Sequence, residues 1–233
     1  MEARFLLVCI LALGLGGGAS AAETVDLQLV LAVDASGSVD PSEYDLQLQG
    51  IALGFHDAAV LQAIHDGPNG AIAVNLLVWA DHQEPQSQSG WFRIGTAAEA
   101  YAFGRVAANF PRAQNGATGI GDGIAAAIRS FDGDGFISVR KVVDVSGDGE
   151  ETPASDAAVM LPQAHAMALA LHITVNGLAI TNQDAFLGPY YENAVKAGPG
   201  SFVMTANSYN DYAEALRRKL LREIQYKPML TRR

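Results

Sequence analysis

Short apolar runs alternate with amphipathic stretches along most of this chain. Residues 29–33 are continuously apolar, and residues 71–80, 141–146 and 172–180 are mostly so. Runs of this length and composition are typical of strands that are buried on both faces of a parallel sheet. The segments 91–94 and 201–205 are expected to form two further short strands, the first of them at a sheet edge.

The stretches between these runs have helical periodicity. After Asp40, apolar residues recur at positions 44, 48, 51 and 55, which predicts one buried helix face. Asp40 can cap this helix, Pro41 suits its first position, and Glu43 completes a capping box. Further helices are predicted over 96–110, 119–131, 155–171 and 209–225. Strands alternating with helices predict right-handed crossovers and a single α/β domain, doubly wound, with a mostly parallel sheet flanked by helices.

The amino terminus has the features of a signal peptide. An apolar run from Phe5 to Leu15 is too short to span a bilayer, which needs about 20 residues. Small residues follow and end in Ala21 and Ala22, which suits cleavage after either one. We therefore expect a signal peptide over 1–21, a domain over 22–233, no integral membrane segment, and a periplasmic or secreted location.

Charge and cysteine content exclude several functions. The sole cysteine, Cys9, lies in the predicted signal peptide, so thiol catalysis and cysteine-bound metals are excluded for residues 22–233. Residues 22–216 contain seven basic and 23 acidic residues. A body this acidic would repel nucleic acid phosphates, so we expect no nucleic acid partner.

Two loops rich in oxygen ligands follow predicted strands. Asp34-Ala-Ser36-Gly-Ser38 directly follows the first strand, and Ser-Gly-Asp148-Gly follows a later one. In open α/β sheets ligands bind beyond the carboxyl ends of the strands, so we expect these loops to meet. Thr118, just before a predicted helix, is a third candidate. Carboxylate, hydroxyl and water oxygens suit magnesium, manganese or calcium better than zinc or copper.

These motifs resemble the metal-ion-dependent adhesion site (MIDAS) of von Willebrand factor type A (VWA) domains. The resemblance covers essentially all of residues 22–233 in motif order and implies the Rossmann-like VWA fold. It also implies that Ser36, Ser38 and Thr118 reach one divalent cation directly or through water, while Asp34 and Asp148 mainly hold those waters. A carboxylate of a protein partner would complete the coordination. Segments 144–149, 176–180 and 219–224 are most similar to a group of uncharacterised exported bacterial VWA-like proteins.

Several of these residues also have simpler interpretations. Asp34 and its serines could form a polar turn that caps the next helix, although an acidic N-cap already does so. Thr118 could be only a helix N-cap. Asp144 is an alternative to Asp148 as the acidic residue of the site. We favour Asp148, because it lies beyond the carboxyl end of the strand, whereas Asp144 lies within the strand.

Other motifs are less informative. Asp132-Gly-Asp-Gly resembles the start of a calcium loop, but the glutamate of an EF-hand is missing, so we interpret it as a turn. The five histidines show no metal-ligand spacing. Trp79, Asp81 and Trp91 flank a loop expected near the metal face, with core packing the preferred interpretation of Trp79.

The sequence favours a metal-dependent protein-binding module that acts outside the cytoplasm and is not an enzyme. It contains no G-x-S-x-G elbow, no H-E-x-x-H and no phosphate loop. The alternatives are a metal-dependent or serine hydrolase, and a VWA fold whose metal is purely structural. The expected cofactor is one divalent cation, magnesium first with manganese or calcium as alternatives. The expected partner is a protein that binds through an acidic side chain.

Overall fold

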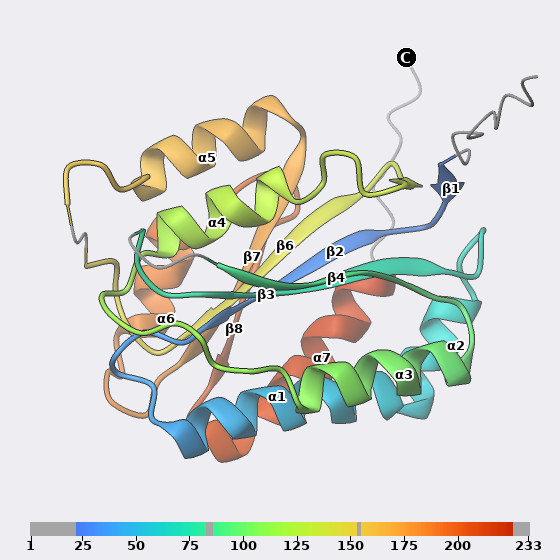
Figure 1. Cartoon of the computed structure of the whole chain (residues 1–233), viewed down its shortest axis with the longest axis horizontal. Helices are drawn as coiled ribbons and strands as arrows, with labels where there is room; N and C mark the ends of the chain where they lie inside the picture. The colour runs from blue at the N-terminus through green and yellow to red at the C-terminus, as the bar shows by residue number, and fades with distance from the viewer. Residues whose placement is uncertain (1–21, 83–85, 153–154, 226–233) are drawn as a thin grey trace, which may run out of the picture.

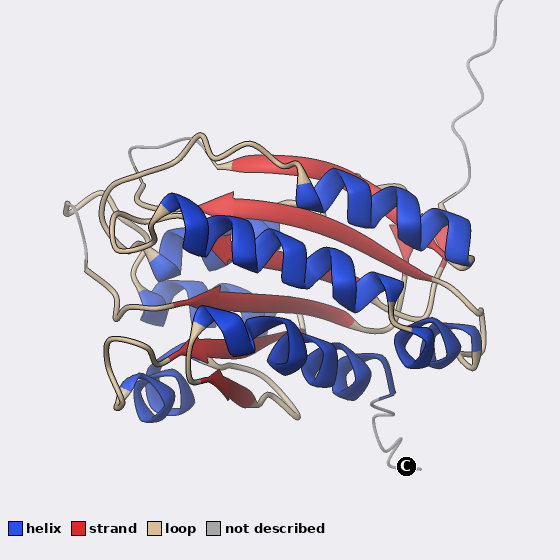
Figure 2. Cartoon of the chain, turned by 90° about the horizontal axis from the view of Figure 1, so that it is seen from below, coloured by secondary structure: helices blue, strands red, loops and turns tan. Residues whose placement is uncertain are grey.

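The computed structural model of the protein describes residues 22–82, 86–152 and 155–225, which form three layers (Figure 1). A six-stranded sheet lies in the middle, with strand order β4-β3-β2-β6-β7-β8. All neighbouring strands are parallel except β4, which is antiparallel to β3. Helices α4 and α5 lie on one side of the sheet, and α1, α2, α3 and α7 on the other (Figures 1 and 2). The predicted doubly wound α/β fold is confirmed.

The described elements have the following bounds. The strands are β1 (Glu23–Thr24), β2 (Gln28–Asp34), β3 (Ile72–Trp79), β4 (Ser87–Ile94), β5 (Phe136–Ile137), β6 (Lys141–Gly147), β7 (Ile173–Ile180) and β8 (Val203–Ala206). The α-helices are α1 (Pro41–His56), α2 (Ala58–His65), α3 (Ala97–Ala108), α4 (Ile120–Arg129), α5 (Leu161–Ala170), α6 (Leu187–Tyr190) and α7 (Tyr212–Gln225). A π-helical turn spans Tyr191–Val195, and a 3-10 turn spans Tyr209–Asp211.

Several elements differ from the sequence prediction, and the short β1, β5 and α6 were not predicted. Strand β4 begins at Ser87, four residues before the predicted start, and α2 was not predicted at all. Helix α5 begins at Leu161, whereas the prediction placed its start at 155. Pro162 stands in its first turn, and the side chain of Gln163 accepts a hydrogen bond from the Met160 amide. These are helix start signals that the apolar periodicity alone did not reveal.

Alternate residues of the central strand β2 supply the two halves of the core. Leu29, Leu31 and Val33 pack with α1, α3 and α7, while Val30 and Ala32 pack with α4 and α5 on the other side. Because every residue of β2 is buried, the strand has no solvent-facing side, and its residues 29–33 form one continuous apolar run. Its first polar residue after this run is Asp34, at the carboxyl end.

Helix α1 begins where its sequence predicts. The Asp40 carboxylate accepts a hydrogen bond from the Glu43 amide at 2.9 Å, and the Glu43 carboxylate accepts one from the Asp40 amide at 2.9 Å. This reciprocal capping box satisfies two backbone donors that the helix would otherwise leave unpaired. It also fixes the backbone at Asp40, two residues after Ser38, and so sets the direction in which the loop that carries Ser38 leads into α1.

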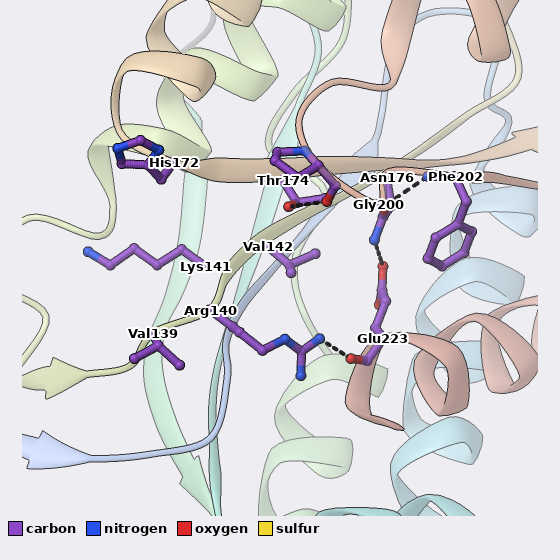
Figure 3. Close-up of a pocket in the computed structure, with 11 residues that line it drawn as sticks. Val139, Arg140, Lys141, Val142, His172, Thr174, Asn176, Gly200, Phe202 and Glu223 are labelled. Carbon is purple, nitrogen blue, oxygen red and sulfur yellow. Dashed lines mark hydrogen bonds between the residues drawn. The ribbon is translucent and has the colours of Figure 1, made fainter. Parts of the chain in front are cut away.

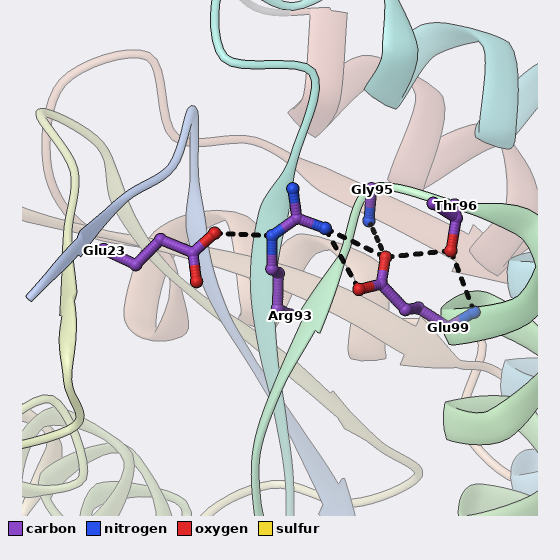
Figure 4. Close-up of polar contacts among 5 residues, drawn as sticks. All are labelled: Glu23, Arg93, Gly95, Thr96 and Glu99. Atoms are coloured by element: carbon purple, nitrogen blue, oxygen red, sulfur yellow. Dashed lines mark hydrogen bonds and ion pairs between the residues drawn. The ribbon is translucent and has the colours of Figure 1, made fainter.

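A polar network fastens the start of the described chain to the edge of the sheet (Figure 4). Arg93 on β4 contacts Glu23 on β1 at 2.5 Å and Glu99 on α3 at 2.9 Å. Glu99 also accepts hydrogen bonds from the Gly95 amide and the Thr96 hydroxyl. The edge strand, the first strand and α3 are therefore held by one guanidinium group.

The amino ends of β6 and β7 enclose a cavity of about 150 Å³ (Figure 3). One wall is polar, because the Asn176 amide donates to the buried Glu223 carboxylate at 2.7 Å and accepts from the Phe202 backbone. Arg140 donates hydrogen bonds to backbone carbonyls at the end of α7. This cavity is at the opposite end of the parallel strands from Asp34 and Asp148.

Candidate metal site

The predicted ligands lie where the strand order of the sheet reverses. Strand β2 has β3, its successor along the chain, on one side and the much later β6 on the other. Asp34 is the last residue of β2, and Asp148 follows the last residue of β6. Their loops therefore leave the sheet side by side at its carboxyl edge, the usual ligand position in such sheets.

Five side chains from three loops meet at this edge. The Ser38 hydroxyl donates a hydrogen bond to Asp148 Oδ1 at 2.6 Å, and the Ser36 and Ser38 hydroxyl oxygens are 3.2 Å apart. The Thr118 hydroxyl lies 3.4 Å from that of Ser36. Asp34 Oδ1 accepts the Ser36 amide at 2.7 Å. The structure thus brings together all five residues that the sequence singled out.

Backbone contacts fix the shape of the serine loop. The Arg112 guanidinium donates to the carbonyls of Ala35 and Ser36 at 3.1 and 3.0 Å. The Gly37 amide donates to the Gly116 carbonyl at 2.8 Å, which ties the serine loop to the threonine loop. These contacts hold the loop in the conformation that brings the Ser36 and Ser38 hydroxyl oxygens 3.2 Å apart.

Thr118 is held by its neighbour loop and does not cap α4. Its amide donates to the Thr152 hydroxyl at 2.9 Å, and the Thr152 amide donates to its carbonyl at 2.9 Å. The N-cap of α4 is Gly119, which has no side chain to cap the helix. The Thr118 hydroxyl is therefore left to face Ser36.

The two acids of the site are buried and incompletely paired. Asp34 is fully buried and Asp148 is 4% exposed, and one oxygen of each (Asp34 Oδ2, Asp148 Oδ2) has no hydrogen-bond partner among the described residues. Burial raises the pKa of Asp34 to about 7, an effect that the charge of Asp148 increases and hydrogen bonds from Ser36 reduce. Two buried carboxylates beside three hydroxyls make a donor set that fits a hard divalent cation.

Asp144 forms an ion pair inside the domain, whereas Asp148 contacts Ser38 at the candidate site. Its carboxylate contacts the ammonium group of Lys219 on α7 at 2.5 Å, and Lys219 also contacts Glu223 at 2.9 Å. All three side chains are buried. Asp144 is thus part of a charge cluster inside the domain, as its position within the strand had indicated.

Several residues around the site were not found by sequence reasoning. The hydroxyls of Tyr191 and Tyr209 are buried near Asp34 and Asp148, although no motif marks either tyrosine. Ser155 Oγ lies 2.8 Å from His82 Nε2, a serine–histidine contact between residues 73 positions apart in the chain. Such pairs leave no local sequence signal, because they form only when distant loops meet.

The three residues that flank the loop after β3 have different surroundings. The Asp81 carboxylate accepts a hydrogen bond from the Ala117 amide, next to Thr118, so Asp81 borders the site. Trp79 is fully buried in the core, as preferred. Trp91 packs against Phe131 and Phe136.

A family model matches residues 24–228, with the description "Protein of unknown function (DUF1194)". The chain belongs to the DUF1194 family. No curated protein sequence matches the chain. Within the described ranges, no helix is long and apolar enough to cross a membrane, and no group of three or more His, Cys, Asp or Glu side chains is placed to hold a metal.

Solved structures share the fold of this DUF1194 protein at low sequence identity. The pilus adhesin SpaC from Lactobacillus rhamnosus GG is 15% identical with a TM-score of 0.59, over 86% of this chain and 31% of the adhesin. Proximal thread matrix protein 1 from the mussel byssus is 15% identical with a TM-score of 0.59, over 88% and 47%. A form of that protein with a zinc-occupied MIDAS motif has a TM-score of 0.56, at 15% identity over 88% and 49%. The predicted VWA fold is confirmed, and the chain spans about a third to a half of these proteins.

Proposed function

We propose that this domain binds one divalent cation at the carboxyl edge of its sheet and uses it to bind an acidic side chain of a partner protein. In this proposal Ser36, Ser38 and Thr118 coordinate the cation directly or through water, while Asp34 and Asp148 hold its waters. Magnesium is the proposed ion, with manganese and calcium as alternatives. The zinc-occupied MIDAS motif in a protein of the same fold supports a divalent cation.

The observation that carries the proposal is the convergence of three hydroxyls and two buried carboxylates at the carboxyl edge of the sheet. Two buried negative charges close together are unfavourable unless a positive charge offsets them. A divalent cation with its waters would offset the charge of both acids at once.

The site is open on one side, which supports binding of an outside oxygen. Ser38 is exposed, whereas Asp34, Ser36, Thr118 and Asp148 are buried. Three neutral hydroxyls also withdraw less of a cation's charge than three carboxylates would. A bound cation would therefore retain attraction for a carboxylate that approaches from the side of Ser38. The adhesin among the proteins of this fold is consistent with such a role.

Calorimetric titration of magnesium into metal-stripped protein tests the first step. We expect one site, which is lost in Ser36→Ala and retained in Ser42→Ala, an exposed serine on α1 outside the site. If magnesium, manganese and calcium all fail to bind at millimolar concentration, the intrinsic metal site is wrong. If the cation binds, proteins retained from the native extracellular fraction with magnesium and released by chelator would test the second step.

One observation favours testing a hydrolase as the second candidate. Ser155 and His82 are in hydrogen-bond contact, which is the first requirement for a nucleophile and its base. His82 Nδ1, however, has no hydrogen-bond partner among the described residues, so none of these residues orients the ring. Peptidase or esterase turnover that disappears in Ser155→Ala and persists in Ser36→Ala would favour this candidate over the binding module.

A further inference from the structure

A buried tyrosine hydroxyl lies behind the candidate metal site. Tyr191, in the π-helical turn after α6, is fully buried, and its hydroxyl has no hydrogen-bond partner in the described part of the chain. A Cβ atom at Gly147 would lie 2.7 Å from this hydroxyl and 2.8 Å from Asp34 Oδ2. The hydroxyl and the unpaired carboxylate oxygen therefore border the same small space beside Gly147.

Packing explains the ring of Tyr191 but not its hydroxyl. The ring lies against the backbone of β7, where a Cβ at Gly177 would come within 2.8 Å of it. Phenylalanine would fill this space equally well and would bury no polar atom. A hydroxyl left unpaired in a core costs about 1–3 kcal/mol, so its place beside an unpaired carboxylate oxygen indicates a polar role.

We propose that Tyr191 is a positioning residue of the metal site. Its hydroxyl holds the outer oxygen of Asp34, directly or through a water, and so fixes the direction in which this carboxylate faces the cation's waters. The inference rests on the proposed function and adds one residue to the five predicted ligands. Groups that orient metal-binding side chains in this way typically change metal affinity about 10- to 100-fold when they are removed.

Tyr191→Phe tests the proposal because it removes the hydroxyl and retains the ring. Manganese binding is followed by electron paramagnetic resonance, and the stability of the metal-stripped protein by urea unfolding. We expect manganese affinity to fall about tenfold or more. The urea midpoint of the metal-stripped protein should fall by a small amount, as expected for the loss of one buried hydrogen bond. The zero-field splitting of bound manganese should also change, which a role in packing alone would not cause.

Tyr212→Phe is the matched control. Tyr212 is buried to the same depth, but its hydroxyl already donates to Ser146 at 3.2 Å. We expect this variant to lower the urea midpoint and to leave manganese affinity within about twofold, since its hydroxyl is not placed to orient either acid. The two variants should therefore have similar effects on stability and different effects on manganese affinity.

The outcomes separate this inference from the proposed function. If the wild-type protein binds manganese and Tyr191→Phe binds it with the same affinity and spectrum, the positioning role is overturned while the metal site stands. Equal loss of affinity in Tyr212→Phe would also overturn it. If the wild-type protein binds no manganese, both are overturned. Should Tyr191→Phe fail to fold, the same measurements on Gly147→Ala, which fills the space between the Tyr191 hydroxyl and Asp34, decide the question.

Discussion

Replacement of Lys219 by methionine should lower the free energy of unfolding, because Lys219 is the cation of a buried charge cluster. Lys219 is fully buried, and its ammonium group contacts Asp144 at 2.5 Å and Glu223 at 2.9 Å. Methionine has a similar length and leaves the packing of α7 nearly intact. The substitution therefore removes one cation and leaves the Asp144 and Glu223 carboxylates inside the domain without their ion-pair partner.

The magnitude follows from how completely these groups are buried. Asp144 is 2% exposed and Glu223 is 1% exposed, so water cannot replace the lost ammonium group. Removing one partner of a buried ion pair typically costs about 3–5 kcal/mol. Because Lys219 serves two acids, we expect about 4 kcal/mol at pH 8, a large part of the stability of about 5–15 kcal/mol that is common for domains.

The loss should grow with pH. Burial raises the pKa of Asp144 from 3.8 to about 7 even though Lys219 opposes the shift, and without Lys219 the pKa should be higher still. A carboxyl whose pKa is raised on folding keeps its proton in the folded chain between the unfolded and the folded pKa. Stability therefore falls as pH rises through that window. At pH 5 Asp144 of the variant keeps its proton, so the cost should shrink to about 1–2 kcal/mol.

Urea unfolding of wild type and Lys219→Met at pH 5, 6, 7 and 8 measures this dependence. Arg218→Met, an exposed position on the same helix, should change the free energy of unfolding by less than about 0.5 kcal/mol. Combining Lys219→Met with Asp144→Asn and Glu223→Gln should recover most of the loss at pH 8. A loss below about 1 kcal/mol at pH 8, or one that does not increase with pH, would refute the reasoning.

Three further predictions concern other parts of the domain. Gly147→Ala fills the space between Tyr191 and Asp34, so magnesium affinity measured by calorimetry should fall about tenfold or more; unchanged affinity would contradict this. Asp40→Ala removes the capping box of α1, and urea unfolding should show a loss of about 1 kcal/mol with magnesium affinity retained. Arg93→Met breaks a half-exposed network, so thermal unfolding should report a loss of no more than about 1 kcal/mol, and a larger loss would mean that β1 contributes more than its contacts indicate.

Much of the candidate site was predictable because its residues lie in short, strongly patterned segments. Asp34, Ser36 and Ser38 follow a strand whose residues are all buried, and the capping box after them marks the next helix. Each feature depends on interactions within a few residues, so it is visible in the sequence. The predicted signal peptide over 1–21 lies outside the described residues and remains a prediction.

The sequence favoured Asp148 over Asp144 from their positions relative to the strand, but it did not reveal their partners. Asp144 lies within the apolar run of β6, and Asp148 lies just beyond it. The packing of α7 brings Lys219 to Asp144, while Asp148 meets Ser38, 110 residues earlier in the chain. Periodicity likewise did not reveal the start of α5, which depends on a proline and a glutamine cap.

The sequence by itself determined the order of the main strands and helices, the acidic charge of the body and the oxygen ligands that each loop carries. Those properties arise from hydrophobic periodicity and from contacts between near neighbours in the chain. The tertiary structure alone decided which buried groups face one another, including Tyr191 behind Asp34 and Lys219 beside Asp144. These pairs join residues more than 60 positions apart, and they exist only after the sheet has assembled and brought its loops together.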